Sequence, residues 1–255
     1  MVSKFLLVSI LDLLLGINFL RPVVFVYNSL GSSPAAQVDQ KTQNAPFLLP
    51  SAETGYFPIR DWGISDPDVA VHSAIVYDSA SDKILFEKYS ELKLPIASLT
   101  KLMTAVAIFE NMDLNDVVAV SGSAIEKSRK DGGGTNLYAG ERIKAFELLK
   151  FMLIKSSNDA AYAFEEHLAE NYNIDLTVKM NDKARQLEMN STFFTEPAGL
   201  DDKDSFSTAK DLVKLTKYSL QYQDLYQILK TQTAEVASID GKLRHQISNT
   251  NQLLG

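Results

Sequence analysis

The sequence has no cysteine, only three histidines and one tryptophan, and fewer basic than acidic residues, 25 against 32. The lack of cysteine excludes disulfides, thiol catalysis and cysteine metal sites; it fits an exported protein, although cytosolic proteins can also lack cysteine. The formal net charge of −7 argues against a nucleic-acid partner, because phosphate binding calls for a basic face. We therefore expect no nucleic-acid function.

Several hydrolase classes are also disfavoured by what is missing. No Gly-x-Ser-x-Gly elbow accompanies His72, His167 or His245, and Glu165-Glu166-His167 does not match the zinc motif His-Glu-x-x-His. The glycine-rich run 131–136 lacks the Gly-Lys-[Ser/Thr] of a phosphate loop, so we interpret it as a loop. We expect the histidines to be structural or surface residues, and we expect no metal or cofactor.

The N-terminal quarter of the chain divides into two segments before the domain begins. After Lys4, residues 5–20 are apolar apart from Asp12 and Asn18, and the pattern over 1–27 is typical of a signal peptide or membrane anchor. A buried core helix is the weaker alternative, and the lack of a clean Ala-x-Ala site leaves cleavage open. Residues 28–66 are rich in Ser, Pro, Ala, Gln and Asn, which indicates a polar linker. The domain is predicted over residues 67–255.

Within the domain, strands bracket a group of helices. The apolar runs 69–78 and 83–89, joined by a short polar turn, predict a β-hairpin. Apolar periodicity predicts helices over 144–154, 158–171, 176–187 and 209–220, with Asp175 and Ser207 as N-caps, whereas 121–130 is interpreted as a polar, exposed segment. This order predicts an α+β fold with a predominantly antiparallel sheet.

A Ser-x-x-Lys motif opens another helix, which is apolar nearly all round and is therefore expected to be buried. Residues three apart on a helix share one face, so the side chains of Ser98 and Lys101 can meet. Desolvation favours a neutral lysine amine, which could accept the proton of the Ser98 hydroxyl and activate it as a nucleophile. Because an isolated Ser-x-x-Lys often occurs by chance, the later Ser156-x-Asn158 element matters: the two stand in the order known from serine β-lactamases and penicillin-binding proteins.

Over residues 69–255 the chain resembles the D-alanyl-D-alanine carboxypeptidases, the low-molecular-mass penicillin-binding proteins. The segments that carry this resemblance are 95–104, Gly140-Glu141, 156–161, 180–184, Thr192-Phe193, Gly199-Leu200, 207–212 and 249–255. The resemblance implies a β-lactamase/transpeptidase-like α+β fold, an antiparallel sheet with a helical cluster. In that family a Lys-Thr-Gly strand follows soon after the Asn-Thr-Asn segment, here Asn249–Asn251, and this sequence contains no such motif. We therefore expect that the C-terminal strands are missing and that the sequence is a fragment.

The resemblance also implies a reaction and its residues. Ser98 would be the nucleophile, Lys101 the general base, Ser156 a proton relay and Asn158 a substrate-binding residue, with no metal. The substrate would be the D-Ala-D-Ala end of a peptidoglycan stem peptide, and β-lactams would acylate Ser98. The enzyme would work outside the cytoplasm, in the cell wall or periplasm, and its N-terminal segment could anchor it to the membrane. The alternatives are a non-catalytic wall-binding pseudoenzyme, a D-Ala endopeptidase or, ranked lower, a β-lactamase of the same superfamily.

Overall fold

The computed structural model describes residues 58–130, 137–200, 204–252 and 254, together with the backbone of two strands closer to the N-terminus, β1 (Phe5–Val8) and β2 (Pro22–Tyr27). These strands join β3 (Ser73–Asp78) and β4 (Lys83–Lys88) in a four-stranded sheet of order β1-β2-β3-β4. The pairs β1–β2 and β3–β4 are antiparallel and β2–β3 is parallel. The β3–β4 pair confirms the hairpin predicted from the sequence.

Most of the predicted signal or anchor segment 1–27 and of the predicted linker 28–66 lies outside the described residues, and both assignments stay predictions. Residues 59–66 form no helix or strand and are exposed. Within the described part of the chain, no helix is both long and apolar enough to cross a membrane.

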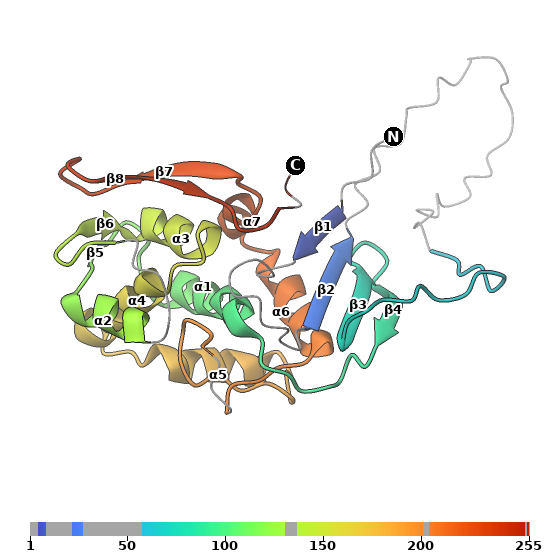
Figure 1. Cartoon of the computed structure of the whole chain (residues 1–255). Helices are drawn as coiled ribbons and strands as arrows, with labels where there is room; N and C mark the ends of the chain where they lie inside the picture. Colours follow the sequence, from blue (N-terminus) through green and yellow to red (C-terminus); the bar gives the residue numbers. More distant parts are fainter. Residues whose placement is uncertain are drawn as a thin grey trace, which may run out of the picture.

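Seven α-helices lie in the described residues beside the sheet (Figure 1). They are α1 (Thr100–Asn111), α2 (Gly122–Lys130), α3 (Ala145–Ile154), α4 (Asn158–Tyr172), α5 (Leu176–Gln186), α6 (Ala209–Ser219) and α7 (Gln223–Leu229). The ends of α3, α4, α5 and α6 lie within one residue of the predicted bounds. The predicted α+β class with a helical cluster is confirmed.

Two local predictions need correction. The segment 121–130 is mostly exposed, as predicted, but residues 122–130 form the helix α2, in which the apolar residues Ala124 and Ile125 are buried. Helix α2 packs on α4 with so few apolar residues that the sequence shows no clear period. The N-cap of α6 is Thr208, whose side chain accepts a hydrogen bond from the Asp211 N–H, whereas Ser207 forms a β-bridge with Leu94. The bridge holds Ser207 in extended backbone, so the cap falls one residue later than expected, on Thr208, while the helix begins at Ala209 as predicted.

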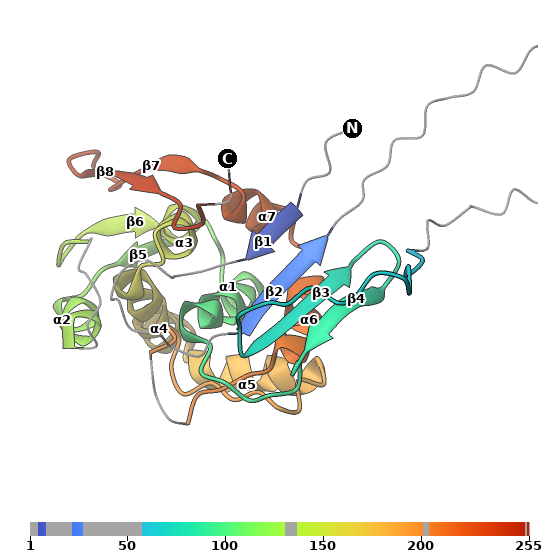
Figure 2. The ribbon, with the colours of Figure 1, turned by 45° about the vertical axis from the view of Figure 1, so that its right-hand side comes forward.

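Helix α1 lies at the centre of the molecule. Its side chains Met103, Val106 and Ile108 are fully buried, as expected for a helix that is apolar nearly all round. Helix α6 packs on α1 with one side and on β2 and β3 with another, and thereby joins the helical cluster to the sheet (Figure 2).

Two short antiparallel pairs cover the far side of the cluster. One is β5 (Val117–Ala119) with β6 (Arg142–Lys144), and the other is the hairpin of β7 (Thr233–Ala237) and β8 (Arg244–Ser248). The β7–β8 hairpin lies over α3, where Val236 and Ile247 are buried (Figure 1). After β8 the chain returns to α3: the Thr250 N–H donates to the Ile154 carbonyl at 3.2 Å.

Candidate active site

Ser98 and Lys101 meet at the start of the central helix. A 3-10 turn, η1 (Ala97–Leu99), carries Ser98 and runs directly into α1, whose second residue is Lys101. The two side chains are in contact, with Lys101 Nζ 3.1 Å from Ser98 Oγ. Ala97, immediately before Ser98, has the left-handed φ of 47°, which few non-glycine residues adopt. Such backbone conformations concentrate at functional sites, where the surrounding structure enforces them.

The amine of Lys101 donates hydrogen bonds to two further oxygen atoms. Nζ donates to Asn158 Oδ1 at 2.7 Å and to the Ala198 carbonyl at 2.6 Å. The Lys101 side chain is almost fully buried, with 2% of its surface exposed. Three segments far apart in the sequence therefore converge on one buried amine.

Burial sets the protonation of this amine. Desolvation disfavours the ammonium form and lowers the pKa of Lys101 from 10.5 to about 7, while the negative charge of Glu196 acts in the opposite direction. The direction agrees with the expectation from the sequence. At neutral pH a substantial fraction of Lys101 is thus a neutral amine.

The corner between α3 and α4 supplies Ser156 and Asn158. Ser157 caps α4 by accepting from the Ala160 N–H at 3.3 Å, and this cap fixes the first turn that carries Asn158. Ser156 has a left-handed φ of 59° and lines the same cavity as Ser98 and Lys101. No hydrogen bond joins Ser156 to Ser98 or Lys101 in the described part of the chain, so the structure links three of the four predicted residues directly and places Ser156 beside them.

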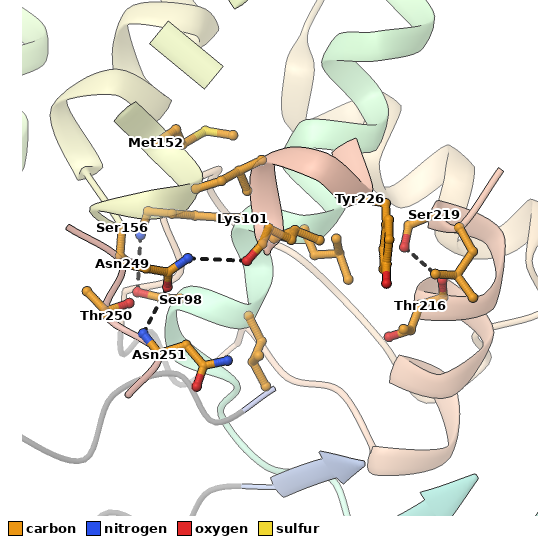
Figure 3. A pocket seen from close by; sticks show the side chains of 15 residues that line it. Ser98, Lys101, Met152, Ser156, Thr216, Ser219, Tyr226, Asn249, Thr250 and Asn251 are labelled. Carbon is orange, nitrogen blue, oxygen red and sulfur yellow. Dashed lines mark hydrogen bonds between the residues drawn. The ribbon is translucent and has the colours of Figure 1, made fainter. Parts of the chain in front are cut away.

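The cavity beside Ser98 has a polar and an apolar side. Ser98, Lys101, Ser156 and the segment Asn249–Asn251 form the polar side (Figure 3). The rest of the wall is mainly apolar, with the hydroxyl side chains Thr216 and Ser219 of α6 as its polar members. The apolar part comes from α1, α3, the residue after α6, and α7: Leu102, Met152, Leu153, Leu220, Tyr226 and Leu229. Asn249–Asn251 belong to the segments of the family resemblance, but no role for them could be predicted from the sequence.

The loop 195–200 is the part of the site that sequence reasoning missed. Gly199 has a φ of +78°, and a Cβ atom there would lie 2.0 Å from the Ala97 carbonyl oxygen. Only glycine lets this loop approach the Ser98 turn so closely. The run Glu196-Pro197-Ala198-Gly199 is typical of a turn. The sequence alone does not indicate that this turn packs against the Ser98 segment.

The three histidines lie in structural or surface positions. His72 is exposed, and His167 lies 3.6 Å from Asp116. His245 pairs with Glu141 at 2.6 Å, and its ring and that of Phe151 pack at a nearly right angle. Within the described residues no group of His, Cys, Asp and Glu side chains is arranged to hold a metal ion.

A family model described as D-alanyl-D-alanine carboxypeptidase matches residues 62–255. The chain belongs to this family. Its relatives include the D-alanyl-D-alanine endopeptidase of Haemophilus influenzae, 37% identical over 71% of this chain and 61% of that protein. Another is the D-alanyl-D-alanine carboxypeptidase DacF of Bacillus subtilis, 29% identical over 71% of this chain and 47% of that protein. The chain thus spans about half to three fifths of the length of these two family relatives.

Two solved structures of similar proteins have the same fold. The Streptomyces K15 DD-transpeptidase superposes with a TM-score of 0.69 at 23% identity, covering 75% of this chain and 78% of that one. A penicillin-binding protein homolog from Mycobacterium tuberculosis gives a TM-score of 0.65 at 27% identity, with 75% and 71% covered. The family and the transpeptidase-like fold predicted from the sequence are confirmed.

Proposed function

We propose that this domain is a serine D-Ala-D-Ala peptidase that acts through an acyl-enzyme on Ser98. The observation that carries the proposal is the contact of Ser98 Oγ with the buried Lys101 Nζ, 3.1 Å away, together with a Lys101 pKa lowered to about 7 by burial. A serine hydroxyl needs such an adjacent base to become a nucleophile. This pair supplies both groups at hydrogen-bonding distance.

The contacts of Lys101 fit the neutral form that a base requires. A neutral amine has two N–H bonds and one lone pair, and two of its neighbours, Asn158 Oδ1 and the Ala198 carbonyl, are acceptors at 2.7 and 2.6 Å. If these acceptors take both N–H groups, the lone pair is left for the hydroxyl of Ser98. Asn158 and Ala198 therefore orient the amine as a proton acceptor toward the nucleophile.

The reaction follows from this orientation. Ser98 Oγ attacks the carbonyl carbon between the two terminal D-alanines while its proton passes to Lys101 Nζ. The Ser98 backbone N–H, at the start of the helical segment, is one donor for the oxyanion. Ser156, on the edge of the cavity, relays a proton to the leaving amine, D-alanine departs, and water then hydrolyses the ester on Ser98. Asn158 contributes to substrate binding as well as to the position of Lys101.

The proposed substrate is a peptidoglycan stem peptide, which places the enzyme outside the cytoplasm, in the periplasm or cell wall. β-Lactams carry a strained amide that resembles the D-Ala-D-Ala terminus and would acylate the same serine. Membrane attachment through residues 1–27 is also proposed, and its support is the apolar sequence of that segment.

Endopeptidase activity is the second candidate. It is favoured by the relatives named D-alanyl-D-alanine endopeptidase from Haemophilus influenzae, Pseudomonas aeruginosa and Escherichia coli, which are 37%, 35% and 31% identical to this chain. The same acyl-enzyme would form when the leaving amine belongs to a peptide cross-link instead of free D-alanine. Release of D-alanine from a D-Ala-D-Ala peptide, compared with cleavage of cross-linked peptide dimers, separates the two activities.

The test of the acyl-enzyme is intact-mass analysis after incubation with a penicillin. We expect one penicilloyl increment, located on the Ser98 peptide and absent from Ser98→Ala. Ser128→Ala is the matched control, because Ser128 is buried in α2 and its hydroxyl has no hydrogen-bond partner among the described residues. Binding of the stem peptide without acylation would instead favour the pseudoenzyme.

A further inference from the structure

The Glu196 carboxylate accepts hydrogen bonds from three backbone N–H groups of the loop that follows it. Its Oε2 accepts from the Ala198 N–H at 2.6 Å, and its Oε1 accepts from the N–H groups of Gly199 and Leu200 at 2.5 and 2.6 Å. The Tyr162 hydroxyl of α4 also donates to Oε2, at 3.1 Å. One carboxylate therefore closes the loop into a tight turn and fastens it to α4.

The same turn is attached to the central helix next to the nucleophile. Thr104 Oγ1 of α1 donates to the Pro197 carbonyl at 2.7 Å, and the Ala198 carbonyl accepts from Lys101 Nζ at 2.6 Å. Gly199 fits against Ala97, the residue before Ser98. The direction of the Ala198 carbonyl thus depends on a turn whose N–H groups are all held by Glu196.

We propose that Glu196 is a positioning residue for the general base: its carboxylate aims the Ala198 carbonyl at Lys101 Nζ, and its negative charge stabilises the positive charge that Lys101 gains when Ser98 is deprotonated. This inference rests on the proposed function. It assigns to Glu196 no contact with the substrate.

The electrostatics of the amine agree with this geometry. Burial lowers the pKa of Lys101, and the charge of Glu196 is the opposing influence that raises it. Without that charge the pKa of Lys101 would be lower still, and Lys101 would be a weaker base. A base works best when its pKa lies near the working pH.

The test replaces Glu196 by glutamine, which keeps the size of the side chain and removes its charge. The rate of acylation by a fluorescent penicillin is measured from pH 5 to 9. In Glu196→Gln we expect the midpoint of the rising limb to move to lower pH by about 0.5–1 unit, since the ammonium form of Lys101 is no longer stabilised. We expect the plateau rate to fall about 10- to 100-fold, because the amide NH₂ opposes the Ala198 N–H and displaces the carbonyl. The matched control is Glu170→Gln, an exposed residue of α4, which should leave both values unchanged.

A second readout does not require acylation. The ¹³Cε resonance of Lys101 is titrated in the Ser98→Ala background with and without Glu196→Gln, and the Lys101 signal is assigned with Lys101→Met. A downward shift of the Lys101 titration supports the positioning role even if the wild-type protein fails to acylate, in which case only the proposed function is lost. If Glu196→Gln lowers the thermal stability or the plateau rate while the titration of Lys101 stays in place, Glu196 merely holds the loop and the inference is overturned.

Discussion

At the residue scale, the buried amine of Lys101 makes the stability of the protein depend on pH. In the folded protein the pKa of Lys101 is about 7, against 10.5 in the unfolded chain, so the unfolded state binds more protons between these values. The destabilisation from this group is complete below about pH 7 and disappears as the pH rises toward 10.5. Between pH 7 and 9 the free energy of unfolding of the wild type should rise relative to that of Lys101→Met, by up to about 1.4 kcal/mol per pH unit.

Urea unfolding of both proteins at several pH values measures this difference. Lys150→Met serves as the control, because Lys150 is a partly exposed residue of α3 that pairs with Glu147. A parallel pH dependence in wild type and Lys101→Met would show that Lys101 keeps its ordinary pKa in the fold.

Gly199 lies against the Ser98 turn at a position where a side chain has no room. Gly199→Ala places a methyl group 2.0 Å from the Ala97 carbonyl oxygen at a φ of +78°, so the loop and the Ser98 turn must separate. We expect a loss of about 3 kcal/mol or more in the free energy of unfolding, with acylation of the remaining folded protein strongly reduced.

The matched control is Gly122→Ala in the first turn of α2, where an added Cβ meets no atom within 4 Å. That change should be neutral or stabilise by a few tenths of a kcal/mol, since alanine is the better helix former. Equal stabilities of the two variants would mean that the loop does not press against the Ser98 turn.

At the scale of elements, the sequence predicted most where a helix buries a continuous apolar face. The bounds of α3 to α6 followed from periodicity, and the presence of α1 followed from a run that is apolar nearly all round after Ser-x-x-Lys. Helix α2 was not predicted because it buries only two apolar residues, Ala124 and Ile125. Its first turn is capped by Ser121, whose Oγ accepts from the Ala124 N–H at 2.8 Å. A short helix formed by tertiary packing leaves little period in the sequence.

The cap of α5 is a prediction at the element scale. Asp175, correctly predicted as an N-cap, accepts from the Val178 N–H at 2.9 Å. Asp175→Ala leaves that donor without its partner and should lower the free energy of unfolding by about 1 kcal/mol, whereas Asp175→Asn keeps an oxygen acceptor and most of the stability. Chemical denaturation of the two variants checks this difference, and equal losses in both would contradict the capping role.

At the scale of the whole molecule, the candidate site is assembled from segments that the chain brings together over long distances. Ser98 and Lys101 could be predicted from local spacing, and Ser156 and Asn158 from a motif that stands with them. The Ala198 carbonyl and Glu196 could not, because the contact between residues 101 and 198 exists only after the turn has folded onto α1. A local sequence pattern can only identify residues that lie close together on one element. A backbone carbonyl such as that of Ala198 is the same in every residue type, so no sequence pattern identifies it.

The attachment of the β7–β8 hairpin is another such long-range contact. His245 of β8 pairs at 2.6 Å with Glu141, whose side chain is fully buried and also accepts from the Tyr138 N–H at 3.1 Å. In His245→Ala the carboxylate stays buried with one partner fewer, so we expect a loss of about 2–4 kcal/mol in the free energy of unfolding. The neighbouring Arg244→Ala breaks only an exposed pair with Glu235 and should cost less than about 1 kcal/mol.

Denaturant unfolding compares the two variants, and penicillin acylation of the folded fraction adds a functional readout. Because the proton of Ser98 passes to Lys101 in the proposed reaction, folded His245→Ala should still be acylated on Ser98. A His245→Ala protein that is as stable as wild type but cannot be acylated would instead place the histidine in the proton route and contradict the Ser98–Lys101 mechanism. Loss of stability with retained acylation means that His245 anchors the hairpin, and with it the Asn249–Asn251 side of the cavity, without taking part in the chemistry.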